Sequence, residues 1–190
     1  MGCGSGNLIF ERGRTARLAV GLDVAMPALQ FCLGLSRGTA CRFARAFGAA
    51  LPLAAASVDM VLLVEVLEHL AAPLAVLREI RRVLRPGGGL FLTTPNYAFP
   101  SLWPVWEWAA DHSGRVPRMA GEQHIQTFGP ASLATMVRQA GLELERLGTF
   151  YQLSPFAALI SEAWADRLVV REIADNGLGG ALLYALARKG

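Results

Sequence analysis

The sequence predicts an α/β protein in which helices cover both faces of a mostly parallel sheet, a three-layer αβα sandwich. Three observations carry the prediction. Strand-like and helix-like segments alternate along the chain, a glycine-rich turn opens the series at residues 2–6, and the run Val58–Val64 is apolar almost throughout. A strand that is covered on both faces has such a continuous apolar pattern, and regular alternation is typical of parallel sheets.

Each element has a local signal. The helix that begins at Pro73 repeats apolar residues every three or four positions, and the turn at 85–88 (Arg-Pro-Gly-Gly) is expected to end it. Pro27 similarly marks a helix start. The expected strands span residues 17–22, 39–44, 58–64, 90–94, 142–151 and 181–188. The expected helices span residues 7–14, 27–35, 73–84, 130–140 and 155–174.

The length of 190 residues fits one domain covering residues 1–190. Within it, residues 97–125 break the rhythm, and we interpret them as an insert that covers the site where a substrate binds. Trp103, Trp106 and Trp108 crowd that insert, and packing the insert onto the domain is an equally good reading of them. Residues 152–190 are expected to form a C-terminal helix and a closing strand.

Composition excludes several classes of protein. Hydrophobic residues make up 53% and charged residues 17%, which is too apolar for a disordered chain. No stretch is apolar and uncharged over the ~18–20 residues that a membrane-spanning helix needs. The net charge of +3 comes with scattered arginines, so a nucleic-acid partner is not indicated. Three cysteines without metal-type spacing favour a reducing, cytoplasmic location.

Residues that follow strands should meet at one edge of the sheet, because the carboxyl ends of parallel strands lie together and bind ligands there. Gly2, Gly4 and Gly6 remove side chains where a backbone passes close to a ligand, and Asn7 departs from the glycine spacing of dinucleotide-binding turns. Asp23 ends the next strand and can accept two hydrogen bonds from a ribose diol. Capping the following helix is the alternative role for this carboxylate.

Several stretches, in this order and spacing, resemble class I S-adenosylmethionine-dependent methyltransferases with the type 11 methyltransferase domain, in particular the group that includes ubiquinone-biosynthesis O-methyltransferases. The stretches are Gly2–Gly6, Gly21–Asp23, Leu51-Pro52 with Ser57–Asp59, Glu65–Leu70, Leu84–Gly88 and Thr94–Asn96. The resemblance covers about residues 1–150. It implies a Rossmann-like fold with an antiparallel last strand and S-adenosyl-L-methionine as the cofactor.

The resemblance also implies roles for single residues. Residues 2–6 would face the methionine part of the cofactor, Asp23 would hold the ribose hydroxyls, and Glu65 would line the pocket. Phe47 stands where the family often has an aspartate for the adenine amino group, so the base would be held by stacking and backbone contacts. The expected cofactor-binding residues are Gly2, Cys3, Gly4, Gly6, Asp23, Val24, Phe47, Gly48 and Glu65.

One departure concerns the beginning of the chain. The family usually has a strand that ends in an acidic residue before the glycine loop, and Met1 stands where that strand should already be finishing. We therefore expect the first strand to be missing, which would leave backbone groups of its neighbours unpaired. A late start of the reading frame and a lost segment both explain this pattern. A truncated, non-catalytic cofactor-binding remnant is accordingly one alternative function.

Methyl transfer from a sulfonium mainly requires alignment, and a base helps when the acceptor is a hydroxyl. His69 and His124 are the candidates for this base. Together with Glu65 and Glu68 they also form a candidate site for a divalent metal, and small-RNA 2'-O-methyltransferases look similar here. In the alternative reading no metal is bound: Glu65 touches the cofactor, Glu68 and His69 begin or cap the next helix, and His124 orders its loop.

The sequence thus predicts S-adenosylmethionine-dependent methyl transfer to a small-molecule acceptor, at oxygen. A metal-assisted RNA 2'-O-methyltransferase is the second enzymatic reading. The helix that begins at Pro155 carries an apolar stripe, which we interpret as core, with contact to a membrane surface as the weaker alternative. That stripe comprises Phe156, Leu159, Ile160, Ala163, Trp164 and Leu168.

Overall fold

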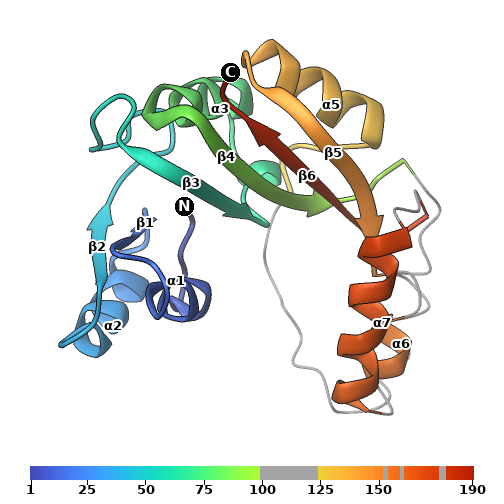
Figure 1. Ribbon diagram of the computed structural model, residues 1–190, viewed down its shortest axis with the longest axis horizontal. Coiled ribbons are helices and arrows are strands. Elements are labelled where there is room, and N and C mark those ends of the chain that lie inside the picture. The colour runs from blue at the N-terminus through green and yellow to red at the C-terminus, as the bar shows by residue number, and fades with distance from the viewer. Residues whose placement is uncertain (99–123, 152–153, 159–160, 176–178) are drawn as a thin grey trace.

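The computed structural model of the chain describes residues 1–98, 124–151, 154–158, 161–175 and 179–190 (Figure 1). The described residues form six strands in two groups. The first group is the parallel pair β1–β2, and the second has the order β3-β4-β6-β5. The strands are β1 (Ala19–Asp23), β2 (Cys41–Arg45), β3 (Val58–Val64), β4 (Leu84–Pro95), β5 (Glu143–Phe150) and β6 (Leu182–Arg188).

Strand β6 is the antiparallel member of the larger group. It pairs antiparallel with both β4 and β5, whereas β3 and β4 pair in parallel. Strands β3, β4 and β5 therefore point the same way, and their carboxyl ends lie at one edge. The expected α/β class, with a mostly parallel arrangement and an antiparallel last strand, is confirmed.

Residues 1–3 lie between the two groups of strands. The backbone N–H of Cys3 donates to the carbonyl of Leu22 on β1 at 3.1 Å, and the amino group of Met1 donates to the carbonyl of Leu62 on β3 at 2.9 Å. No strand precedes the first helix in the described part of the chain. These two hydrogen bonds connect the pair β1–β2, at the left of Figure 1, with the four-stranded group.

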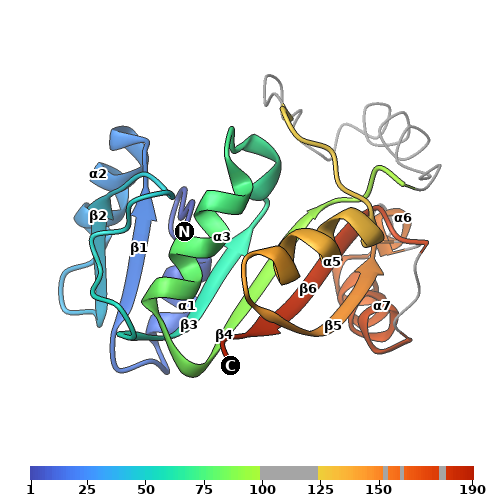
Figure 2. The same cartoon turned by 90° about the horizontal axis from the view of Figure 1, so that it is seen from above.

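Helices form the outer layers. α3 (Pro73–Val83) and α5 (Pro130–Gln139) cover one face of the larger sheet, as Figure 2 shows from above. α1 (Asn7–Gly13) and α2 (Met26–Leu35) pack against β1 and β2. α6 (Ser154–Ala158) and α7 (Glu162–Asp175) pack on each other below the end of β5. Across the described residues, no helix combines the length and apolarity needed to cross a membrane.

The core lies between α3, α5 and the sheet. The inward face of α3 buries Leu77, Ile80 and Val83 completely, at the helical spacing that the sequence predicted. Leu90 and Leu92 face them from β4, and Leu133 and Val137 add the contribution of α5. Each of these aliphatic side chains contributes about 1.5–3 kcal/mol to folding by leaving water.

Two expectations about elements were wrong. β4 already begins at Leu84, so the Arg-Pro-Gly-Gly segment continues the strand with an irregular register. Gly87 has a left-handed φ of 75°, and its N–H donates to the carbonyl of Lys189 at 2.7 Å, so the bend is compatible with pairing. The expected single helix at 155–174 is divided into α6 and α7.

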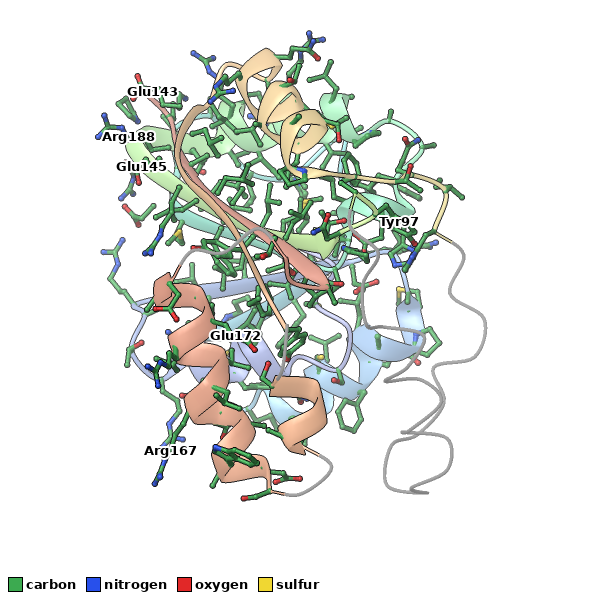
Figure 3. All side chains as sticks on the ribbon, turned by 90° about the vertical axis from the view of Figure 1, so that its right-hand side faces the viewer. Tyr97, Glu143, Glu145, Arg167, Glu172 and Arg188 are labelled. Carbon is green, nitrogen blue, oxygen red and sulfur yellow. The ribbon has the colours of Figure 1, made fainter. Side chains whose placement is uncertain are left out.

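The apolar stripe of this region is also not core as a whole. Ala163 and Trp164 are exposed on α7, whose inward face is set by Ala165 and by the partly buried residues Leu168 and Glu172. Glu172 fixes that orientation, because its carboxylate accepts hydrogen bonds from the backbone of Tyr151 and Ser154 at 2.8 and 3.0 Å (Figure 3). The remaining stripe residues, 156, 159 and 160, fall outside the described side chains.

Candidate cofactor and acceptor site

The glycine loop adopts a backbone that side chains rarely allow. Gly2, Gly4 and Gly6 all have positive φ, at 64°, 46° and 82°. A Cβ on Gly6 would lie 2.8 Å from Sγ of Cys32, and one on Gly2 would collide with Val66. Nothing lies within 4 Å of the corresponding position on Gly4. Gly2 and Gly6 are thus required by internal packing, whereas Gly4 faces open space where a ligand can approach.

Asp23 holds this loop. One carboxylate oxygen accepts the backbone N–H of Gly4 at 2.8 Å, and the other accepts the N–H of Ala25 at 2.9 Å. Ala25 is the N-cap residue of α2 and has no side-chain cap, so Asp23 bonds the residue before the helix and does not cap the helix itself. A carboxylate offers about four acceptor positions, and these two bonds use half of them. The remaining capacity is sufficient for the two hydroxyls of a ribose.

The residues that follow β1 and β2 extend the candidate site along the edge of the sheet. Val24 is exposed, and its carbonyl accepts a hydrogen bond from Nε of Arg45 at 3.1 Å. The ring of Phe47 is 65% exposed, with the Arg45 guanidinium carbon 6.0 Å from its centroid. Gly48 has no room for a side chain, because a Cβ there would meet Met1 and Val76. An apolar ring in this position offers a flat surface for stacking.

A pocket of about 230 Å³ opens beside the glycine loop. Its floor is the face of β3 that carries Leu62 and Val64, and the first turn of α1 closes another side. The lining residues are Met1, Gly2, Cys3, Gly4, Ser5, Asn7, Leu8, Ile9, Leu62 and Val64.

Two thiols lie against the loop. Burial, above all, raises the pKa of Cys3 to about 11 and also raises that of Cys32. The thiol of Cys32 donates to the carbonyl of Gly4 at 3.3 Å, which adds a second support for that turn. Both thiols, like that of Cys41, are unbridged. Their raised pKa values make them packing groups, not nucleophiles.

Glu65 directly follows β3 and has a left-handed φ of 50°, which is unusual for a residue with a side chain. Its carboxylate accepts a hydrogen bond from Oγ1 of Thr93 at 2.5 Å, and its N–H donates to the same oxygen at 3.2 Å. Strained backbone of this kind persists where surrounding contacts enforce it, and it concentrates at functional sites. Glu65 is therefore fixed at the edge of the sheet close to the loop.

Glu68 is the buried charge of the site, with 1% of its surface exposed. It lies in the short 3-10 helix η1 (Leu67–His69), and its Oε2 accepts a hydrogen bond from Thr94 at 2.9 Å. Its Oε1 has no hydrogen-bond partner among the described residues. A buried acceptor without a partner is costly and commonly marks a site that binds something.

The histidines gather around that oxygen. Nε2 of His69 lies 3.6 Å from Oε1 of Glu68, and the rings of His69 and His124 are 5.0 Å apart at their centroids. One ligand atom from each of Glu68, His69 and His124 lies within 4.8 Å of the others. Glu65 does not belong to this group. We call these three residues the Glu68 cluster.

Three functional side chains were missed by the sequence analysis. Thr93 and Thr94 hold the two carboxylates, and the phenol of Tyr97 contacts Nδ1 of His124 at 2.6 Å. The motif Thr94–Asn96 at the end of the strand indicated that this region belongs to the site. Which carboxylate each threonine contacts depends on the strand pairing, which the sequence does not show. Tyr97 follows β4 at the end of the sheet opposite to Glu143, Glu145 and Arg188 (Figure 3). Trp103, Trp106 and Trp108 lie outside the described residues.

The chain is similar to known proteins over most of its length. A family model described as a methyltransferase domain matches residues 1–92. The ubiquinone biosynthesis O-methyltransferase of Xanthomonas axonopodis pv. citri is 35% identical over 60% of this chain and 43% of that protein. The enzyme of the same name from Xanthomonas euvesicatoria is 30% identical over 88% of this chain and 67% of its own length.

A solved S-adenosylmethionine-dependent methyltransferase from Mesorhizobium loti superposes with a TM-score of 0.67 and 17% identity, covering 99% of this chain and 88% of the other. At that identity the likeness concerns the fold. Together with the sequence relatives, it places this chain in the family of class I S-adenosylmethionine-dependent methyltransferases. The chain spans less than half the length of the first of those relatives.

Proposed function

We propose that this chain binds S-adenosyl-L-methionine at the glycine loop and transfers its methyl group to an oxygen atom of a small molecule. The observation that carries the proposal is the hydrogen bond between Gly4 and Asp23. It joins a side-chain-free turn that is open to solvent to a carboxylate with unused acceptor capacity. Family membership supports this cofactor in particular.

The cofactor would extend along the edge of the sheet. Its methionine part would lie over the loop and beside Glu65, its ribose on Asp23 next to Val24, and its adenine against Phe47 and Gly48. The exposed ring of Phe47 supports stacking of the base in place of the acidic contact that is usual in the family. Free thiols in Cys3, Cys32 and Cys41 fit a reducing, cytoplasmic location.

The Glu68 cluster would serve the acceptor. Alignment of nucleophile, methyl carbon and sulfur contributes most of the rate, and a hydroxyl acceptor additionally has to lose its proton. His69 can take that proton while the buried carboxylate of Glu68 stabilises the positive charge that the imidazole gains. This arrangement favours oxygen as the methylated atom, in agreement with the names of the Xanthomonas relatives.

We propose further that residues 97–125 cover the acceptor. Both ends of this segment lie at the cluster, because Tyr97 contacts His124 through its phenol. A depression of about 400 Å³ adjoins Tyr97 and the start of α5, where Phe128 and Pro130 line it. Such a position suits an aromatic or otherwise apolar acceptor with one hydroxyl to be methylated.

The donor set of the Glu68 cluster also fits a divalent cation. A carboxylate with one oxygen that has no hydrogen-bond partner among the described residues, and two imidazoles with ligand atoms within 4.8 Å, are donors that such ions accept. Glu68, His69 and His124 would hold the ion, with Glu65 held separately by Thr93. A bound cation would lower the pKa of a coordinated hydroxyl and so replace the imidazole as the source of activation.

The decisive experiment measures both binding and turnover. Calorimetric titration with S-adenosylhomocysteine tests the cofactor site, and mass spectrometry follows transfer of a deuterated methyl group to a panel of phenols, catechols, amines and thiols. We expect binding, product with a hydroxyl acceptor, and loss of product in His69→Asn with binding unchanged. Glu145→Gln, at the far edge of the sheet, is the matched control. Product from amines alone would overturn the oxygen assignment.

The same assay separates the alternatives. Methylation of RNA 2'-hydroxyls that depends on added divalent ions would support the RNA methyltransferase reading. Binding without transfer to any acceptor would support a cofactor-binding remnant. Absence of heat at millimolar S-adenosylhomocysteine would contradict the cofactor site itself. A turnover that is unchanged by a chelator would leave His69 as the activating group.

A further inference from the structure

We propose that Tyr97 is a positioning residue that fixes the tautomer of His124. By donating its phenol proton to Nδ1, it keeps the ring proton of His124 on Nε2. His124 then serves the Glu68 cluster as a hydrogen-bond donor, and His69 remains as the proton acceptor. The inference rests on the proposed function where it assigns these roles, but the tautomer itself can be measured without any reaction.

The first step is the contact between the two side chains. Oη of Tyr97 lies 2.6 Å from Nδ1 of His124, and the two rings are nearly perpendicular at 89°. A hydroxyl donor forms shorter hydrogen bonds than a ring N–H does, by about 0.2 Å. The short separation therefore favours the phenol as donor. Nδ1 is thereby occupied, and Nε2 is the nitrogen that remains for another contact.

The second step is electrostatic. Glu68 presents a buried carboxylate whose Oε1 has no hydrogen-bond partner among the described residues, and one of its oxygens lies within 4.8 Å of a ring nitrogen of His124. An N–H directed toward a carboxylate forms a favourable charge-assisted contact, and a lone pair directed toward it does not. The contact with the phenol and this preference select the same tautomer.

The third step is the rigidity of the pair. The N–H of Tyr97 donates to the carbonyl of Phe128 at 2.8 Å, just beyond His124 in the chain. The N–H groups of Ile125 and Gln126 both donate to the backbone carbonyl of Glu68 at 3.0 Å. Backbone hydrogen bonds thus fix the positions of Tyr97, His124 and Glu68 relative to one another. The phenol can select a tautomer because its distance to the imidazole is set by the main chain.

This tautomer gives His69 and His124 different roles, which the sequence left open. With the proton on Nε2, neutral His124 has no free lone pair in the cluster and cannot act there as the base. It can instead donate to the oxygen of the acceptor and orient it. His69, whose Nε2 lies 3.6 Å from Oε1 of Glu68, is the imidazole that remains for the role of base. Among the described residues, Glu68 and His69 are the titratable groups that share the cluster with this pair.

Nitrogen-15 NMR of the imidazoles tests the inference directly. The chain has three histidines, so His69→Asn, His124→Asn and the same change at His112 assign the signals. The chemical shifts of Nδ1 and Nε2 report which nitrogen carries the proton. We expect the Nε2–H tautomer in His124 of the wild type. In Tyr97→Phe the tautomer ratio should fall by roughly two- to tenfold, the effect of one ordinary hydrogen bond.

Tyr184→Phe is the matched control, because it removes a phenol that donates to the carbonyl of Ile173 at 3.3 Å, outside the cluster. An Nδ1–H tautomer in the wild type would overturn the inference, as would a ratio that Tyr97→Phe leaves unchanged. For turnover we expect Tyr97→Phe to lower kcat with S-adenosylhomocysteine affinity intact. A chain that binds no cofactor but shows the expected tautomers would contradict the proposed function and leave this inference standing.

Discussion

The carboxylates of Glu65 and Glu68 are held by consecutive residues of one strand. Thr93 donates to Glu65 at 2.5 Å, and Thr94 donates to Glu68 at 2.9 Å. Successive side chains of a strand point to opposite faces of the sheet. The two acids, three positions apart in the sequence, are therefore anchored on opposite sides of β4, and Glu68 is the one that lies with the histidines. This division is the basis of the first prediction.

Glu68→Gln should lower turnover by about 10²–10⁴-fold, the range associated with loss of acid–base assistance. The amide oxygen can still accept from Thr94, so the fold and the affinity for S-adenosylhomocysteine should stay unchanged. Glu68→Ala leaves the Thr94 hydroxyl buried without its partner and should cost about 1–3 kcal/mol of stability. Steady-state kinetics and chemical denaturation measure the two effects. A Glu68→Gln enzyme with full turnover would exclude a role in activation.

Asp23→Ala should weaken S-adenosylhomocysteine binding by roughly ten- to hundredfold, the loss expected for charge-assisted hydrogen bonds to the ribose. The change also frees the N–H groups of Gly4 and Ala25, so a modest fall in Tm should accompany it. Asp59→Ala is the control, because that carboxylate is 81% exposed and pairs with Arg85 at the far end of β3. Calorimetry gives the affinities. Equal affinities for wild type and Asp23→Ala would remove the main support for the cofactor site.

The glycines of the loop should respond differently to alanine. In Gly4→Ala there is space for the added methyl group. The positive φ of an alanine there should lower the free energy of unfolding by about 1–2 kcal/mol. The methyl group would also project into the space proposed for the ligand. We expect a clear loss of cofactor affinity with a small loss of stability. Gly6→Ala should mainly destabilise the fold, because its methyl group meets Cys32 and Phe10. Thermal melts with and without S-adenosylhomocysteine distinguish the two, and the reverse pattern would contradict the assignment of Gly4.

Cys3 should react slowly with alkylating reagents although it borders the pocket. Its pKa of about 11 leaves little thiolate at pH 8, so its reaction with iodoacetamide should be on the order of a hundredfold slower than that of an ordinary cysteine. The rate should climb steadily up to about pH 11. Mass spectrometry after timed alkylation measures it. Rapid labelling of Cys3 at pH 8 would show that the loop opens in solution.

Glu79 should make stability depend on pH. A hydrogen bond from Arg82, above all, lowers the pKa of its carboxyl, which also accepts the N–H of Leu51 at 2.8 Å. A lowered folded-state pKa contributes stability above the unfolded value of about 4.3, and the contribution disappears as pH falls through the folded value. Glu79→Gln should thus lower Tm at pH 7 and converge with wild type in acid. Glu162→Gln, on the exposed first turn of α7, is the control, and an equal deficit at all pH values would exclude this linkage.

Local sequence patterns correctly predicted several elements of the fold. Val58–Val64 forms β3 with the bounds that its apolar run predicted, and α3 begins at Pro73 with its predicted inward face. The prediction of a turn at 85–88 was wrong. Hydrogen bonds to Lys189, about a hundred residues away in the chain, pair this segment with the end of the chain, so it belongs to β4. The helix expected at 155–174 is divided into α6 and α7, and Glu172 of α7 accepts the backbone N–H of Ser154 at the start of α6.

The sequence by itself determined the order of strands and helices, the glycine loop and the acid that follows the next strand, because periodicity and spacing are local properties. The tertiary structure decided that Glu68 and not Glu65 joins His69 and His124, and that Tyr97 meets His124 across 27 positions. Those contacts depend on which face of β4 each threonine occupies and on the backbone pairs that bring distant segments together. Strand register and three-dimensional proximity set them, and neither is encoded in any short stretch of residues.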